Sequence, residues 1–130
     1  MTVYDSSVLI SYLNGEDGAV RYVREHIDER AVALPIVVFE VYQGEVFKSG
    51  AADFDAVDGA LEWLTVIENT AEIARSAAEL QTVLHEQGSA LAARDTFIAG
   101  TAMALDERLV VADSDFDVAG ISDVLDVDLV

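Results

Sequence analysis

Residues 88–116 have the sequence GSALAARDTFIAGTAMALDERLVVADSDF. Gly88 and Ser89 predict a turn, and apolar residues then recur at helical spacing from about Ala92 to Leu105. RLVVA favours a buried strand, and the polar DSDFD that follows it favours a turn. A helix that leads directly into an apolar strand is typical of folds in which parallel strands are connected through helices.

The rest of the chain alternates in the same way. Further strands are expected at 2–4, about 31–34, 64–67 and near 124–127. Helical patterns lie between them at 7–27, as one or two helices, and at 35–50, 51–63 and 69–88. Pro35 suits the first turn of one helix, and Asn69 with Glu72 resembles a capping box at the start of another. The sequence therefore predicts an α/β protein, a three-layer α/β/α sandwich with a mostly parallel central sheet.

Length and composition limit the kinds of protein that this chain can be. With 130 residues, of which 52% are hydrophobic, we expect a single domain over 1–130 with a substantial core. The start MTVYDSS lacks the features of a signal peptide, and the longest apolar stretch, 31–39, is too short to span a membrane. We therefore expect a cytoplasmic protein with no membrane segment.

The chain contains no cysteine and two histidines. This composition excludes disulfides, zinc fingers and thiol nucleophiles, so any bound metal ion must be held by oxygen. Ser6 and Ser7 also lack the G-x-S-x-G setting of a serine hydrolase.

The charge of the chain is strongly negative, with 25 acidic and 7 basic residues and a formal net charge of −18. Our hypothesis is adaptation to a salt-rich cytoplasm, in which surface carboxylates keep a folded protein in solution. Such a charge repels nucleic acid at low salt. At about 1 M salt the Debye length is only about 3 Å, so local contacts decide binding.

Two acidic residues stand where a requirement for solubility does not explain them. Asp5 directly follows the first strand, at the sheet edge where sites form, although it can equally act as the N-cap of the next helix. On a helical wheel Glu40 lies within roughly 60° of four residues of small or apolar type. These are Ile36, Val37, Gly44 and Phe47. A carboxylate there needs a partner, either a cation in a site or an arginine, unless it extends to solvent from the rim.

Three more acidic residues lie near the predicted helix and strand of 88–116. Asp95 shares a helical face with Ile98, Ala99 and Ala102, although it can also cap the helix, and Arg94 beside it can be a surface charge. Asp113 and Asp115 follow the strand directly, in a position where aspartate also favours ordinary turns.

These acidic residues form a consistent set because they come from strand ends and from apolar helix faces. If the strand-end and helix carboxylates converge, they would bind one hard cation, which prefers oxygen ligands.

The chain resembles the PIN domains, and in length it resembles the small VapC toxins of toxin–antitoxin pairs. VYDSSVLI resembles the first strand of that family with its Asp-Ser-Ser, and VVFEVYQG resembles the helix that carries its Glu. The stretch 88–116 resembles the Asp-x-x-Ile-Ala-x-x-Ala helix, with the strand and acidic turn that follow.

The resemblance implies an Mg²⁺- or Mn²⁺-dependent endoribonuclease that leaves a 5′-phosphate. It implies a homodimer that is inhibited by a small antitoxin, whose segment covers the acidic groove. Ser7 would support a carboxylate or water in the site. By resemblance, the catalytic and metal-binding acids are Asp5, Glu40, Asp95 and Asp113, with Asp115 as a further metal ligand.

Two other functions fit parts of the sequence. A PIN fold without catalysis can serve as an interaction module, and a metal-dependent cleavage assay separates that function from a nuclease. A receiver-like phosphoacceptor domain is also an acidic α/β protein. It requires an aspartate after the third strand, where LTVIENT has none, and a lysine late in the chain, whereas Lys48 is early.

Overall fold

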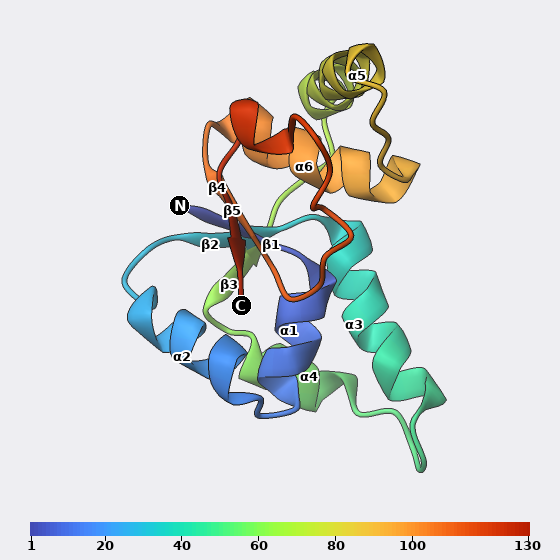
Figure 1. Cartoon of the computed structure of the whole chain (residues 1–130). Helices are drawn as coiled ribbons and strands as arrows, with labels where there is room; N and C mark the ends of the chain where they lie inside the picture. The colour runs from blue at the N-terminus through green and yellow to red at the C-terminus, as the bar shows by residue number, and fades with distance from the viewer.

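A computed structural model describes residues 1–130 and contains one five-stranded sheet between two layers of helices (Figure 1). All neighbouring strands pair in parallel. In chain order the strands are β1 (Thr2–Tyr4), β2 (Ala31–Ala33), β3 (Leu64–Val66), β4 (Arg108–Val111) and β5 (Val127–Leu129). The parallel sheet confirms the predicted fold class.

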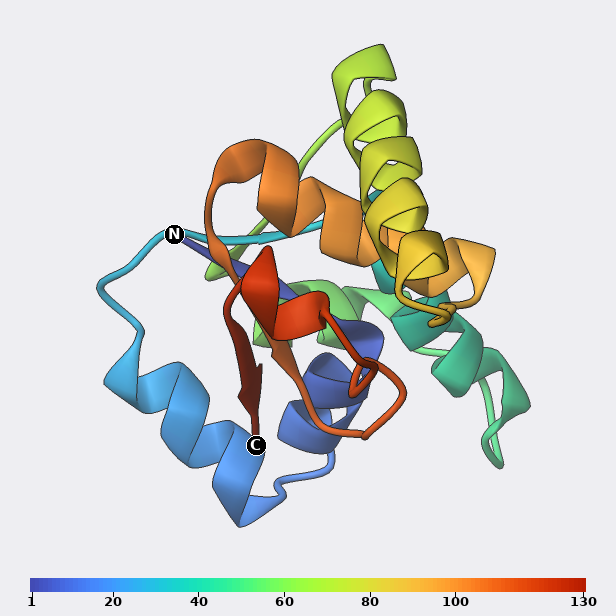
Figure 2. The same ribbon diagram turned by 45° about the horizontal axis from the view of Figure 1, so that its top comes forward.

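Six α-helices cover the sheet, together with a short 3-10 helix, η1 (Ile121–Asp123). The four helices α1 to α4 lie below the sheet in Figure 1, and α5 and α6 lie above it; Figure 2 shows the same two groups from a second angle. Their bounds are α1 (Ser6–Leu13), α2 (Asp17–Glu25), α3 (Pro35–Phe47), α4 (Phe54–Ala60), α5 (Ala71–Glu86) and α6 (Ala93–Leu105). None of these helices combines the length and the apolar character that crossing a membrane requires.

The strand order is β3-β2-β1-β4-β5. From β1 the chain adds β2 and β3 on one side, and it then returns across the sheet to place β4 on the other side. The order of strands therefore reverses between β1 and β4, and in open parallel sheets the groove at the carboxyl ends of such strands is the usual place for a site. Receiver domains have the order 2-1-3-4-5, so the receiver-like alternative is wrong.

Most of the predicted elements are present, with differences at their ends. The segment 7–27 forms two helices because Gly15, with φ +74°, interrupts it. Thr70, rather than Asn69, caps α5, since its Oγ1 accepts a hydrogen bond from the Ile73 amide at 3.2 Å. The last strand begins at Val127 and not at Val124, because the chain before it turns through η1.

The shift of the last strand has a packing cause. Ile121 and Leu125 are both buried, and one helical turn between them carries both side chains into the core. Residues after Asp126 are then free to pair with β4, in a register that sets Leu109 opposite Val127.

Candidate functional site

Asp5 lies at the carboxyl end of β1 and is 2% exposed. Its Oδ2 accepts hydrogen bonds from the Ser7 amide at 3.4 Å and the Ser7 hydroxyl at 2.7 Å. Asp5 is therefore the N-cap of α1, so the capping explanation holds. It is not the whole role of the side chain, because Oδ1 accepts a bond from Arg94 at 3.0 Å.

Ser7 connects this carboxylate to the neighbouring strand. Its Oγ donates to Asp5 and accepts a hydrogen bond from the Ala112 amide at 3.0 Å. Tyr4 pairs with Val110 in the sheet, so the ends of β1 and β4 lie side by side. Ser7 therefore fixes Asp5 at the point where the strand order reverses.

Glu40 projects from α3, and 28% of its side chain is exposed. The prediction that Glu40 lies within an apolar face of the helix is only partly correct. Val37 is buried, but Ile36 and Phe47 are exposed, the latter to 79%. The buried side of α3 consists of Val37, Val38 and Val41. Glu40 therefore lies at the edge of the packed face, because the other side of this helix faces solvent.

Asp95 is in the first turn of α6, with a side chain that is 13% exposed. Ile98, Ala99 and Ala102 are fully buried, as the helical face predicts. The N-cap of α6 is Ala92, so capping does not explain Asp95. Burial raises the pKa of Asp95 above its usual range, and the charge of Asp5 adds to this effect, although the bond from Arg94 opposes it.

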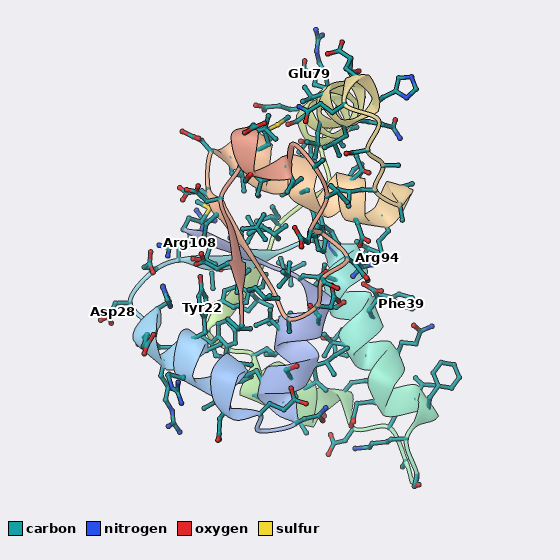
Figure 3. All side chains as sticks on the ribbon, viewed as in Figure 1. Tyr22, Asp28, Phe39, Glu79, Arg94 and Arg108 are labelled. Carbon is teal, nitrogen blue, oxygen red and sulfur yellow. The ribbon has the colours of Figure 1, made fainter.

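Arg94 joins the three acids and is not the isolated surface charge that the sequence allowed. Its Nε donates to Glu40 Oε1 at 2.7 Å, and its Nη2 donates to Asp5 Oδ1 at 3.0 Å. Nη1 donates to Asp95, and Nη2 also bonds Glu40 and, at 2.8 Å, the Ser6 hydroxyl. Figure 3 shows Arg94 between α6 and the start of α3. An arginine was one of the expected partners of Glu40, and Arg94 is that partner.

The carboxylates around Arg94 stabilise its positive charge. Burial by itself lowers its pKa, but the hydrogen bond to Glu40 and the charge of Asp5 outweigh burial and hold the pKa above its usual value. The guanidinium therefore stays a cation, bound by carboxylates from the residue after β1, from α3 and from α6.

Asp113 and Asp115 lie in the loop after β4. Asp113 Oδ1 accepts a hydrogen bond from the Asp115 amide at 3.1 Å, as in an ordinary Asx turn. No hydrogen bond or ion pair joins either of them to Asp5, Glu40 or Asp95. Asp115 is near enough for its charge to raise the pKa of Asp95. The structure thus brings three predicted acids together, leaves Asp115 near them, and connects Asp113 only to the Asp115 amide.

Comparison with known proteins identifies the family. The model of the PIN domain matches residues 2–121. The chain belongs to the PIN domain family. No match was found among curated protein sequences.

Several solved structures share the fold of this PIN domain. VapBC2 from Rickettsia felis, bound to a promoter DNA fragment, is 17% identical with a TM-score of 0.76, over 99% of this chain and 98% of that one. FitAcB from Neisseria gonorrhoeae is 20% identical with a TM-score of 0.79, over 98% and 96%. A toxin–antitoxin complex from Klebsiella pneumoniae is 22% identical with a TM-score of 0.75, over 93% and 92%. At these identities the likeness establishes the shared fold.

The residues of this PIN domain fit a hard divalent cation by their chemistry. Three carboxylates from separate elements direct oxygens at one positive group, and oxygen is the ligand that Mg²⁺ prefers. In the present conformation, however, no three acidic or histidine side chains are arranged to hold a metal ion. The guanidinium of Arg94 lies among their oxygens instead.

Two residues of the site, Arg94 and Ser6, were not predicted from the sequence to belong to it. For Arg94 a signal existed, because it is the second residue of α6. The amino end of a helix carries a partial positive charge and disfavours a cation, so an arginine there requires acidic partners. Ser6 offers no comparable signal, since its hydroxyl contacts the site only through Arg94.

Proposed function

We propose that this PIN domain is a metal-dependent endoribonuclease, a VapC-like toxin that hydrolyses RNA phosphodiester bonds. One observation carries the proposal. Asp5, Glu40 and Asp95 come from three different elements and converge on one cation at the reversal of strand order. Asp5 is buried and only 13% of the Asp95 side chain is exposed, so both carboxylates would be costly without such a partner.

Asp5, Glu40 and Asp95 would hold Mg²⁺ or Mn²⁺, and Asp113 and Asp115 would complete the ligand set from the loop after β4. When bound, the ion would neutralise phosphate oxygens and activate a water for attack at phosphorus. The chain's own part is to position the carboxylates. Ser7 fixes the orientation of Asp5 through a bond at 2.7 Å, as the groups behind metal ligands commonly do. The products would be an RNA 3′-hydroxyl and a 5′-phosphate, formed in the cytoplasm where the substrate is.

A small antitoxin is the proposed partner, and three observations support it. The solved structures with this fold include VapBC and toxin–antitoxin complexes. An exposed apolar surface lies on α3 and α4, next to Glu40, and the segment 40–58 that forms most of it contains five acidic residues and one lysine. It is formed by Phe39, Tyr42, Val46, Phe47 and Phe54. We assign this surface to an apolar antitoxin segment with basic residues, which would also cover the acidic groove, and we propose that the toxin itself is a homodimer.

Co-purification tests the partner. A small protein encoded beside this chain should co-elute with the wild type, and Phe47→Glu should abolish that complex while leaving the toxin dimeric by light scattering. The matched control is Val66→Glu on the edge strand β3, which should bind normally. If Phe47→Glu binds as tightly as the wild type, the surface on α3 is not the antitoxin site.

A non-catalytic interaction module is the second candidate function. The observation in its favour is that Arg94 already pairs with all three acids, as in a structural ion-pair network. A network of this kind requires no metal. The two candidates differ in one result, which is cleavage of RNA when Mn²⁺ is added.

Single substitutions in the acids test the nuclease. Asp5→Asn and Asp95→Asn remove a charged ligand but keep the shape of the side chain, so each should fold and lose about a hundredfold or more of its Mn²⁺-dependent cleavage. Circular dichroism checks the fold, and a fluorescent RNA reports cleavage. The control is Asp28→Asn, an exposed residue on the opposite side of the molecule (Figure 3). Full activity in Asp5→Asn or Asp95→Asn would remove that residue from the site.

A further inference from the structure

The guanidinium of Arg94 uses all of its nitrogens on the proposed metal ligands and one neighbouring hydroxyl. Nε bonds Glu40 at 2.7 Å, Nη1 bonds Asp95, and Nη2 bonds Asp5 at 3.0 Å and Ser6 at 2.8 Å. This is more than an ion pair at the rim of a site. The arginine side chain fills the space among the three carboxylates.

The charges in this group do not balance. Three carboxylates face a single guanidinium, so an excess of two negative charges remains among partly buried side chains. In such surroundings charges interact more strongly than in water, and the excess favours a second or a more highly charged cation. A divalent ion would satisfy this requirement better than the monovalent guanidinium does.

Arg94 and a divalent ion cannot both occupy the place among the carboxylates. The oxygens that would coordinate the ion are Asp5 Oδ1, Glu40 Oε1 and Asp95 Oδ1, and each accepts a hydrogen bond from Arg94. A divalent ion held by those oxygens would lie against the N–H groups, and the two positive charges would repel each other. This explains why no three acids are arranged to hold a metal while the arginine is in place.

The partial exposure of the Arg94 side chain allows it to leave the site. Asp5 is almost fully buried, with 3% of its side chain exposed, whereas 31% of the Arg94 side chain is exposed. Arg94 sits in the first turn of α6, and its flexible stem can turn toward solvent without any change in the helix. The carboxylates can therefore exchange one cation for another while the backbone stays in place.

We propose that Arg94 is a built-in counter-ion that competes with the divalent ion for Asp5, Glu40 and Asp95 and leaves when the ion binds. This inference rests on the proposed metal site. It gives the arginine two effects: the metal-free protein stays folded because its acids are paired, and the nuclease remains inactive below a threshold concentration of divalent ion.

Calorimetric titration with Mn²⁺ alone, without RNA, tests the competition. Arg94→Gln removes the competing charge, so this variant should bind Mn²⁺ at least about tenfold more tightly than the wild type. Its melting temperature without metal should fall and should recover as Mn²⁺ is added. The control is Arg75→Gln, which removes an exposed arginine paired only with Glu79 on α5 and should leave Mn²⁺ affinity unchanged.

The outcomes separate this proposal from the metal site itself. If the wild type and Arg94→Gln bind Mn²⁺ with equal affinity, the metal site stands and the competition is wrong. Weaker binding by Arg94→Gln also contradicts the competition, because the arginine would then support the ion. If neither protein binds Mn²⁺, the metal site and the competition both fail.

The wild-type protein offers a second test that does not depend on the folding of a variant. In the absence of metal, the Nε–H signal of Arg94 should be protected from exchange with water, because that proton is bonded to Glu40. Titration with diamagnetic Mg²⁺ should remove this protection, and the spectrum of Arg94→Lys identifies the signal. A protected signal that persists at saturating Mg²⁺ would overturn the exchange.

Discussion

The Ser7 hydroxyl makes two hydrogen bonds that no other side chain in the site makes. It donates to Asp5 Oδ2 and accepts from the Ala112 amide, so it connects the first helix, the proposed metal ligand and the end of β4. A small hydroxyl in this position orients the carboxylate without occupying the space where an ion would bind.

Substitution of Ser7 by alanine should affect both stability and activity. Ser7→Ala leaves the Ala112 amide and one Asp5 oxygen without this partner, which should lower the free energy of unfolding by about 1–3 kcal/mol. Cleavage should fall by about 10–100-fold, because the carboxylate is less well oriented. Urea unfolding and the fluorescent RNA assay measure the two effects. Ser122→Ala, at an exposed position in η1, is the control, and equal stability of the two variants would contradict this role.

Individual residues of the site were predictable to different degrees. Asp5 could be singled out because it directly follows the first strand, and Asp95 because it shares a helical face with small and apolar residues. Glu40 was located for a partly incorrect reason, since much of its supposed apolar face is exposed. The position of the Asp113 side chain was not predictable, because it depends on the conformation of a loop and on a local bond to the Asp115 amide.

Helices α5 and α6 pack at unusually close range where Gly100 meets Ala77. A Cβ added to Gly100 would lie 2.5 Å from Ala77 Cα, which is backbone and cannot move aside. This contact holds α6 in the position from which it presents Arg94 and Asp95 to the site.

A methyl group at Gly100 should therefore force the two helices apart. Gly100→Ala should destabilise the protein by about 1–3 kcal/mol in urea unfolding, as overpacked cores do. The control is Gly59→Ala in α4, where nothing lies within 4 Å of an added Cβ. That change should stabilise the helix by about 0.5–1 kcal/mol, because alanine loses less backbone entropy than glycine. If Gly100→Ala is as stable as Gly59→Ala, the close packing is not essential.

The elements with a clear local signal were predicted well. α5 has apolar residues at helical spacing and a capping side chain, and α3 begins at a proline that suits the first helical turn. The region after β4 was predicted less well. Short apolar stretches there fit either a strand or a turn of helix, and burial of Ile121 and Leu125 decided between the two.

The net charge of −18 is a property of the whole chain, and it opposes folding when salt is low. Like charges on the surface of a compact protein repel each other, and salt at about 1 M limits this repulsion to distances of about 3 Å. We therefore expect the melting temperature to rise as KCl increases from about 0.1 to 2 M.

A variant with fewer surface acids provides the control for this expectation. Glu25→Lys, Glu62→Lys and Glu86→Lys are at exposed positions, and each reduces the net negative charge by two. The triple variant should melt at a temperature that depends less on KCl. If the wild type is equally stable as salt is removed, adaptation to salt is not the reason for its acidity.

The overall architecture could be predicted from the sequence, because alternating strands and helices can pack in only a few arrangements. Those arrangements place the residues after β1 and β4 together, which is why Asp5 could be assigned to a site. The position of the Arg94 guanidinium among the acids could not be predicted from the sequence, because it depends on a contact between residues 89 positions apart.

The proposed nuclease requires that Asp5, Glu40 and Asp95 bind a divalent metal ion. The most direct test is a crystal grown with Mn²⁺ and measured for the anomalous scattering of manganese. We expect a single strong peak coordinated by oxygens of Asp5, Glu40 and Asp95, with the Arg94 side chain turned away toward solvent. A map without a peak among these carboxylates, in which Arg94 still bonds all three, would contradict the proposed metal site.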